Sequence, residues 1–231
     1  MIIPAYNEEE SIFETVTSIL NYRKKVDFDL DYVVINDGST DKTKQILEEN
    51  HFNAVNLVMN LGIGGAVQTG YKYALEHDYD VAVQFDGDGQ HDIESLSDLL
   101  EPIRKKEADL VIGSRFVGDV KSEFQTTFMR RFGISVISNL IKWTTGQRVL
   151  DTTSGYRLAD KTVIKQFAKR YPIKYPEPEN ILKRKYRVVE RPANMFERTG
   201  GVSSITPIKS IRYMLEVCSS IVIAAFMKES E

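Results

Sequence analysis

Two aspartates and a glutamine stand at alternate positions directly after an apolar stretch of this 231-residue chain. The apolar stretch covers residues 81–85, and the polar residues that follow it are Asp86, Asp88 and Gln90. Hard divalent cations prefer carboxylate and amide oxygens, and a cation that is shared with a diphosphate needs only a few of them from the protein. The spacing therefore predicts that Asp86, Asp88 and Gln90 hold Mg²⁺ or Mn²⁺.

A calcium loop and a solvated turn without function are two other interpretations of this run. An EF-hand loop needs glycine at its sixth position and glutamate at its twelfth, where this chain has His91 and Ser97. A solvated turn would not require three oxygen-bearing side chains at alternate positions. We therefore rank the metal site above both alternatives.

A second polar run, at 36–41, closes the apolar stretch 32–36. Its last residues suit the N-cap of a following helix, which is one explanation for them. The other explanation places the Asp37 carboxylate in a cleft, where it accepts a hydrogen bond from a nucleotide base or ribose. Both explanations stay open at this point.

A glycine-rich run at 60–66, which includes Gly64, follows the apolar stretch 54–59 and opens a helical pattern. This arrangement is typical of dinucleotide-binding turns, so an NAD-dependent oxidoreductase is an alternative function. The third glycine position of that motif is Val67, and its acidic residue, Asp86, belongs to the paired carboxylates. The oxidoreductase is therefore a distant alternative, and close backbone packing explains part of the glycines.

Short β-rich stretches alternate with helical patterns over the first half of the chain, which is typical of an α/β protein with a mostly parallel sheet. The predicted strands cover 32–36, 54–59, 81–85 and 110–114, and the predicted helices cover 9–22, 41–50, 65–76 and 95–106. Ligands of such sheets bind beyond the carboxyl ends of the strands, where the polar runs fall. Only three residues precede Pro4, so we expect a nearly absent first strand in a clipped sequence.

The charge balance and the cysteine count limit the class of protein. The chain has a formal net charge of −3, which argues against a nucleic-acid-binding protein. Its single cysteine, Cys218, excludes an internal disulfide and favours a reducing compartment. The first residues lack a basic segment followed by a long apolar one, so we expect no secretory signal. These features predict a cytoplasmic protein.

Four motifs together resemble the family 2 glycosyltransferases of the GT-A fold, in residue type, order and strand-end position. They are Pro4-Ala5-Tyr6-Asn7-Glu8-Glu9, Asn36-Asp37-Gly38-Ser39-Thr40-Asp41, Asp86-Gly87-Asp88-Gly89-Gln90-His91 and Gly113-Ser114-Arg115. With Ser154-Gly155-Tyr156-Arg157 added, the chain is most similar to the dolichyl-phosphate mannosyltransferase and bacterial polyprenyl-phosphate glycosyltransferase branch. The resemblance covers about residues 1–205 and implies a Rossmann-like, mostly parallel sheet flanked by helices.

The resemblance implies a metal-dependent, inverting transfer of a sugar from a UDP- or GDP-sugar to a polyprenyl or dolichyl phosphate. The implied donor-binding residues are Pro4, Tyr6, Glu8, Asp37, Gly64 and Asp86. The implied metal ligands are Asp86, Asp88 and Gln90. The implied acceptor- or phosphate-binding residues are Arg115, Arg131, Ser154 and Arg198. The predicted catalytic residues are Asp88, Arg115, Glu177 and Glu179.

The chemistry of the acceptor separates two hypotheses. A phosphate acceptor is already an anion at neutral pH and needs no general base, whereas a sugar hydroxyl does. Glu177, Glu179 and Asp151 are the candidates for that base, so a transferase that builds polysaccharide or glycolipid chains is the alternative. A catalytically silent nucleotide-binding module is a further one.

The chain divides by its patterns into a predicted glycosyltransferase domain at 1–204 and a tail at 205–231. Within the domain we assign 1–115 to the nucleotide-sugar half and 116–204 to the acceptor half. The tail mixes basic and apolar residues, which suits an amphipathic helix on an anionic membrane, on a small membrane partner protein or on the protein's own core. We expect the protein to be peripheral at the cytoplasmic face of a membrane.

Overall fold

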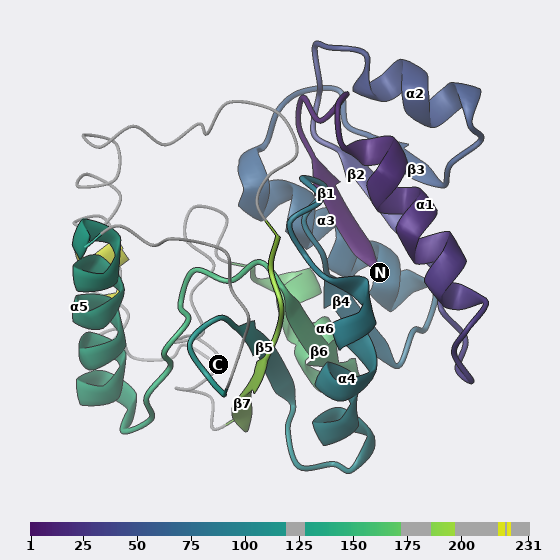
Figure 1. Cartoon of the computed structure of the whole chain (residues 1–231). Coiled ribbons are helices and arrows are strands. Elements are labelled where there is room, and N and C mark those ends of the chain that lie inside the picture. The colour runs from purple at the N-terminus through teal and green to yellow at the C-terminus, as the bar shows by residue number, and fades with distance from the viewer. Residues whose placement is uncertain (119–127, 172–185, 197–216, 220, 223–231) are drawn as a thin grey trace.

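The computed structural model describes residues 1–118, 128–171, 186–196, 217–219 and 221–222, with the backbone alone at 128–132. In the described part of the chain, seven strands form one sheet in the order β3-β2-β1-β4-β6-β5-β7 (Figure 1). The strands are β1 (Ile2–Ala5), β2 (Val33–Asn36), β3 (Ala54–Asn56), β4 (Val81–Gln84), β5 (Leu110–Ser114), β6 (Arg157–Asp160) and β7 (Val188–Pro192). Every neighbouring pair is parallel except the two that involve β6. The prediction of a mostly parallel sheet is confirmed.

The first strand is complete enough to pair on both sides, so the expectation of a nearly absent strand is wrong. β1 continues through Pro4 to Ala5 and pairs with β2 along its whole length. Its other neighbour is β4, where Ile2 lies opposite Gln84. β1 is therefore a central strand of the sheet.

Helices cover both faces of the sheet. One face carries α1 (Ile12–Arg23), α2 (Thr43–Glu49) and α4 (Leu96–Arg104), with a short 3₁₀ turn, η1 (Ile93–Ser95), before α4. The other face carries α3 (Gly62–Glu76) and α6 (Lys161–Lys169). None of the helices in the described part of the chain combines the length and hydropathy that crossing a bilayer requires.

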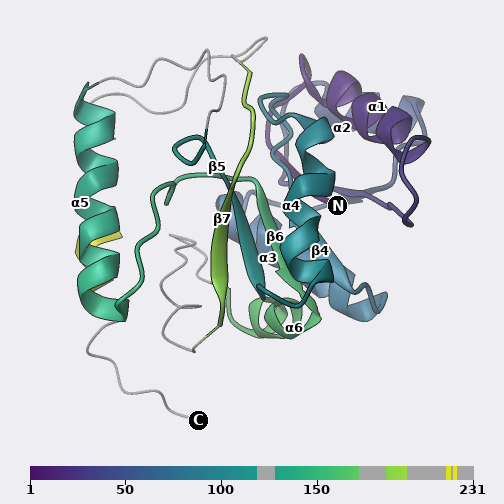
Figure 2. The same cartoon turned by 60° about the horizontal axis from the view of Figure 1, so that its bottom comes forward.

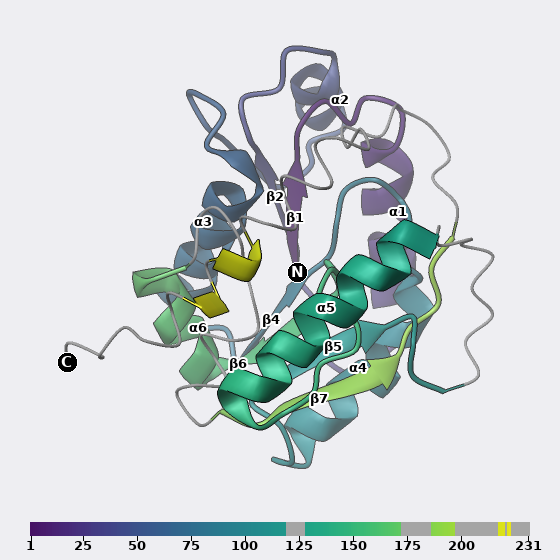
Figure 3. The same cartoon turned by 90° about the vertical axis from the view of Figure 1, so that its left-hand side faces the viewer.

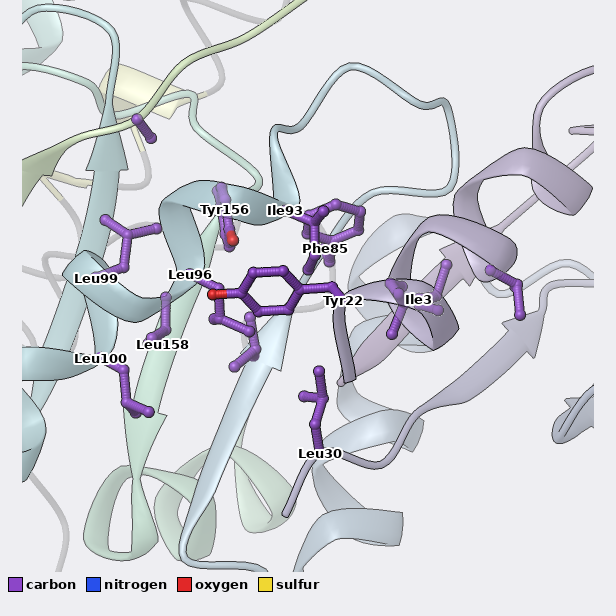
Figure 4. Close-up of a cluster of buried hydrophobic side chains, with 14 of the residues drawn as sticks. Ile3, Tyr22, Leu30, Phe85, Ile93, Leu96, Leu99, Leu100, Tyr156 and Leu158 are labelled. Atoms are coloured by element: carbon purple, nitrogen blue, oxygen red, sulfur yellow. The ribbon is translucent and has the colours of Figure 1, made fainter. Parts of the chain in front are cut away.

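Alternation along the strands divides the core into two layers. In β5, Val111 faces the layer of α1 and α4, whereas Leu110 faces the layer of α3 and α6, because successive side chains of a strand point to opposite faces. Figure 4 shows the first layer, where Tyr22 of α1 lies near Phe85 and Leu99 of α4 lies nearer to Leu158 of β6. The layers hold the strand ends, and thus the loops that follow them, in fixed positions.

Helix α5 (Phe128–Thr145) lies on the same side of the sheet as α3 and α6, at the end formed by β5 and β7 (Figures 2 and 3). Its Ile137 and Ile141 pack against Ile112 of β5. Val217 and Ile221 of the predicted amphipathic tail are fully buried in this same cluster. The described part of the tail therefore packs on the protein's own core, which was one of the three surfaces considered for it.

Candidate active site

Loops after β1 and β2 are tied together by hydrogen bonds. Asn7, which has a φ of 56° in the left-handed region, accepts a hydrogen bond at Oδ1 from the Thr40 N–H at 2.8 Å. The neighbouring Tyr6 has an exposed ring, with 47% of its surface accessible, and Glu8 is half-buried. Two of the predicted donor-binding residues thus stand beside the loop that carries a third, Asp37.

Asp37 lies at the end of β2 and is almost completely buried. Its N–H donates to the Ala5 carbonyl at 2.8 Å, and its Oδ1 accepts from the Leu61 N–H at 2.7 Å. Burial raises the pKa of the Asp37 carboxyl, against the opposing effect of the Leu61 and Gly62 N–H groups. The carboxylate therefore satisfies a backbone group at the start of α3, and its contact with a nucleotide stays a prediction.

The predicted metal-binding run begins where β4 ends and is anchored through Gly87. The Gly87 N–H donates to the Pro4 carbonyl at 3.3 Å. The Gly87 carbonyl accepts from the buried hydroxyls of Ser11 and Thr15, at 2.9 and 3.2 Å. Since Ser11 and Thr15 stand one turn apart at the start of α1, that helix fixes the backbone between the two aspartates.

The far end of the run pairs with the segment that follows β7. The Phe196 N–H donates to the Gln90 carbonyl at 2.8 Å, and His91 forms an antiparallel bridge with Met195. Within the run, Asp88 Oδ1 accepts from the Gln90 N–H at 3.1 Å. A segment more than a hundred residues away in sequence therefore closes the loop that carries the predicted metal ligands.

Asp86 is the most constrained carboxylate of the run. Its Oδ1 accepts a hydrogen bond from Gln84 Nε2 at 3.4 Å, and its Oδ2 lies 3.4 Å from His91 Nε2. Burial works to raise the pKa of Asp86, but His91, with smaller contributions from Gln84 and Arg157, outweighs burial and lowers it. The side chain keeps 32% of its surface accessible, so a charged carboxylate faces the site.

The donor set of the run fits a cation that arrives with a diphosphate. Among the described residues, no three His, Cys, Asp or Glu side chains stand close enough to hold a metal by themselves. The run offers two carboxylates, Asp86 and Asp88, and the Gln90 amide carbonyl. Mg²⁺ and Mn²⁺ take such a set when phosphate oxygens fill the remaining positions.

Arg115, directly after β5, forms a buried ion pair with Asp151. Its Nε and Nη2 donate to the two Asp151 oxygens at 2.8 and 2.7 Å, and Nη2 also donates to Thr153 Oγ1 at 2.8 Å. The side chains are 6% and 0% exposed. Burial favours a higher pKa for Asp151, but Arg115 outweighs it and holds the pKa below its ordinary value. A carboxylate that is fully enclosed and paired with Arg115 cannot reach an acceptor hydroxyl, so Asp151 does not suit the role of general base.

Ser154 and Arg157 organise the turn before β6. Ser154 Oγ donates to the Gly113 carbonyl at 2.6 Å and accepts from the Tyr156 N–H at 3.2 Å. The buried Arg157 donates from Nε to the Ser154 carbonyl at 2.8 Å and from Nη2 to the Thr152 carbonyl at 3.1 Å. The Ser154 hydroxyl is thus used inside the protein, and its contact with an acceptor stays a prediction.

The remaining predicted site residues fall into two groups. Gly64 lies buried in the first turn of α3, where the structure places it near the Asp37 contact with Leu61. The residues outside the described part of the chain are Glu177, Glu179, Arg198 and the side chain of Arg131. Their predicted roles stay predictions.

Sequence patterns did not reveal several residues that hold the site in place. They are Ser11, Thr15, Gln84 and Glu190. Arg157 belongs to a motif of the resemblance, but its hydrogen bonds to the turn before β6 were not predicted. No strand is predicted around Glu190, whereas Gln84 carries the one available signal, a polar side chain inside an apolar strand pattern. Such a residue needs a hydrogen-bond partner when it is buried, so it marks a network rather than a surface.

Comparisons with known proteins agree with this arrangement. The family described as Glycosyl transferase family 2 matches residues 1–171. A UDP-N-acetylglucosamine–dolichyl-phosphate N-acetylglucosaminyltransferase of Methanococcus voltae is 34% identical over 195 residues, which are 74% of each chain. An undecaprenyl-phosphate mannosyltransferase of Micrococcus luteus is 32% identical over 217 residues, 89% of this chain and 86% of its own.

A solved structure supports the fold. Glucosyl-3-phosphoglycerate synthase from Mycobacterium tuberculosis, in complex with Mn²⁺ and UDP-glucose, superposes with a TM-score of 0.69 at 17% identity and covers 99% of this chain and 79% of its own. At that identity the likeness concerns the GT-A arrangement of strands and helices. The family match over 1–171 favours a transferase over the oxidoreductase alternative. The chain belongs to glycosyl transferase family 2, and the protein is a glycosyltransferase.

Proposed function

We propose that the enzyme transfers a sugar, with inversion, from a nucleotide-diphosphate donor to a polyprenyl or dolichyl phosphate in a metal-dependent reaction. The placement of Asp86, Asp88 and Gln90 beside the loops of Pro4 and Asp37 carries the proposal. Relatives named for dolichyl, polyprenol and undecaprenyl phosphates support the acceptor. The UDP in the name of one relative, and in the complexes of the solved structures, favours UDP over GDP as the nucleotide.

In this proposal each part of the site has a physical task. Asp86, Asp88 and Gln90 would hold Mg²⁺ or Mn²⁺, which when bound neutralises charge on the departing diphosphate. Tyr6, Glu8 and Asp37 orient the nucleotide at the ends of β1 and β2. An acceptor phosphate is anionic at neutral pH, so the protein needs only to place it near the anomeric carbon. We assign 1–115 to the donor half and 116–204 to the acceptor half.

The resemblance implies that Arg115 is catalytic and binds phosphate, but in this proposal its main task is structural. Its ion pair with Asp151 fixes the guanidinium at the end of β5. Asp151 neutralises most of its charge, so Arg115 fixes the loop after β5, and the predicted phosphate contact falls mainly to Arg131 and Arg198. The catalytic assignments of Glu177 and Glu179 belong to the same proposal.

We also propose peripheral binding at the cytoplasmic face of a membrane, where a lipid phosphate is presented. Within the tail at 205–231, the basic residues and the apolar residues other than the buried Val217 and Ile221 support it, and a small membrane partner protein is the alternative binding partner. Co-flotation with vesicles that contain anionic lipid tests this part. Recovery of the protein only in the vesicle-free fraction, at low and physiological salt alike, would contradict it.

One assay tests donor, metal and acceptor together. Purified enzyme is given UDP- and GDP-sugars with Mn²⁺ or Mg²⁺, with and without a short polyprenyl phosphate, and nucleoside diphosphate and glycolipid are measured. We expect nucleoside diphosphate release to rise with the lipid phosphate and a glycolipid to appear in equal amount. If nucleoside diphosphate release requires a saccharide acceptor instead, the sugar is transferred to a hydroxyl, and Glu177 and Glu179 are then the candidate bases.

A further inference from the structure

The backbone of Gly155 lies directly against the carboxylate of Asp86. A Cβ added to Gly155 would lie 2.7 Å from Asp86 Oδ1, and closer still to its Cγ and Oδ2. Real Cβ contacts essentially never fall below 3.0 Å. All three nearest atoms belong to this one carboxylate, so the absence of a side chain at Gly155 makes the space that Asp86 occupies.

Two side chains contact the same carboxylate from other directions. Gln84, which is 4% exposed, donates from Nε2 to Oδ1 at 3.4 Å, and its Oε1 accepts from the Tyr171 hydroxyl at 3.5 Å. The His91 ring is packed between Phe85 and Tyr156, with Nε2 3.4 Å from Oδ2. The carboxylate is therefore fixed by three elements, β4, the metal-binding run and the turn before β6.

The position of Gly155 is itself determined by the acceptor side of the molecule. Ser154 donates a hydrogen bond to the Gly113 carbonyl at the end of β5, and Arg157 donates hydrogen bonds to two backbone carbonyls of the same turn. The antiparallel pairing of β6 with β4 places Arg157 opposite Gln84. One rigid turn thus connects the end of β5 to the carboxylate at the end of β4.

We propose that Gly155 and Gln84 are positioning residues that set the direction of the Asp86 carboxylate toward the metal and the donor diphosphate. The inference rests on the proposed function, because it takes Asp86 as a metal ligand. Groups around a ligand orient it and adjust its strength, and their substitution commonly lowers metal affinity about 10- to 100-fold. Gly155 has no side chain and so leaves space for the Asp86 carboxylate, whereas Gln84 orients the carboxylate by a hydrogen bond.

Two substitutions and one control test this. Gly155→Ala pushes the carboxylate away, and Gln84→Leu keeps the volume of the side chain but removes the hydrogen bond. Gly146→Ala is the matched control, because Gly146 has a φ of 77° and no described residue lies within 4 Å of its added Cβ. It strains the end of α5 without reaching Asp86.

The readout is the affinity for Mn²⁺ with whichever of UDP and GDP the wild-type enzyme binds, measured by calorimetry, together with the melting temperature. We expect Gly155→Ala and Gln84→Leu to weaken Mn²⁺ binding about 10- to 100-fold, and saturating Mn²⁺ to restore part of the transfer rate. Gly146→Ala should melt earlier but bind Mn²⁺ like the wild type.

The outcomes separate the inference from the proposed function. Wild-type affinity in both site variants would overturn the inference and leave the proposed function standing. If Gly155→Ala fails to fold, the affinity of Gln84→Leu decides. A wild-type enzyme that binds no Mn²⁺ with either nucleotide would overturn both.

Discussion

A single buried ion pair fixes the Arg115 guanidinium at the end of β5. Asp151 is fully enclosed, and it accepts hydrogen bonds from the Arg115 side chain and from the Arg115 N–H at 3.0 Å. Removing one partner of such a pair leaves an uncompensated buried charge, which commonly costs about 3–5 kcal/mol. The pair is therefore a point where one substitution has a large effect.

We expect Asp151→Asn to lower the free energy of unfolding at pH 7 by about 3–5 kcal/mol in urea titrations. The pKa of the Asp151 carboxyl is lower in the folded protein than its ordinary value of 3.8. The stability that the charged Asp151 adds is therefore fully present at pH values above the ordinary pKa. It is lost as the pH falls through the lower pKa of the folded protein. The difference between variant and wild type should shrink below about pH 4.

The control for this experiment is Glu101→Gln, which breaks an exposed ion pair with Lys105 at 2.6 Å. Water screens that pair, so its loss should leave the unfolding curve nearly unchanged. An Asp151→Asn protein as stable as the wild type at neutral pH would show that the carboxylate does not carry its charge in the folded state.

Asp88 carries the predicted chemistry most directly. We expect Asp88→Ala to reduce nucleoside diphosphate release at least about 100-fold, because transition-state charge on the diphosphate loses its stabilisation. Its melting temperature should stay near the wild-type value, since its side chain is half-exposed. Asp29→Ala, at an exposed position on the loop before β2, is the control. Full activity of the Asp88 variant would refute the metal assignment.

The edge strand β7 holds the loop at Leu150 and Asp151 through one carboxylate. Glu190 accepts hydrogen bonds from the N–H groups of Leu150 and Asp151, both at 2.7 Å. β7 itself is positioned by its parallel pairing with β5. A strand that sequence patterns did not predict thus fixes the loop that supplies the counter-ion of Arg115.

We expect Glu190→Gln to lower the free energy of unfolding by about 1–3 kcal/mol, because its amide has one acceptor oxygen for two N–H donors. Hydrogen exchange should accelerate at the Leu150 and Asp151 amides and stay unchanged in α3. Glu107→Gln, at an exposed position after α4, is the control. Unchanged exchange at those two amides would show that the loop is held by other contacts.

Ligand binding should stabilise the whole molecule, because loops from β1, β2 and β4 and the segment after β7 meet at one site. We expect UDP or GDP with Mn²⁺, at about 100 times the dissociation constant, to add ~2.7 kcal/mol and raise the melting temperature by about 5–10 °C. EDTA should abolish the shift, and NAD should give none. An equal shift with NAD, or one that resists EDTA, would contradict a metal-bound nucleoside diphosphate.

Local sequence was sufficient to predict most strands and helices in the first half of the protein. Apolar stretches that are followed directly by Asp37 and Asp86 predicted β2 and β4. The carboxyl ends of parallel strands meet at one edge of a sheet, so the two aspartates were expected at the same edge. Residue type and spacing also identified the family, because the loops after those strands carry their motifs in continuous segments.

Only the tertiary structure decided what surrounds those motifs. β6 is four residues long and begins with Arg157, so its membership in the sheet depends on pairing with β4 and β5 and not on its own pattern. Gly155 and Asp86 are far apart in sequence and meet because β6 runs antiparallel beside β4. Contacts of this kind depend on long-range packing, which short patterns along the chain do not encode.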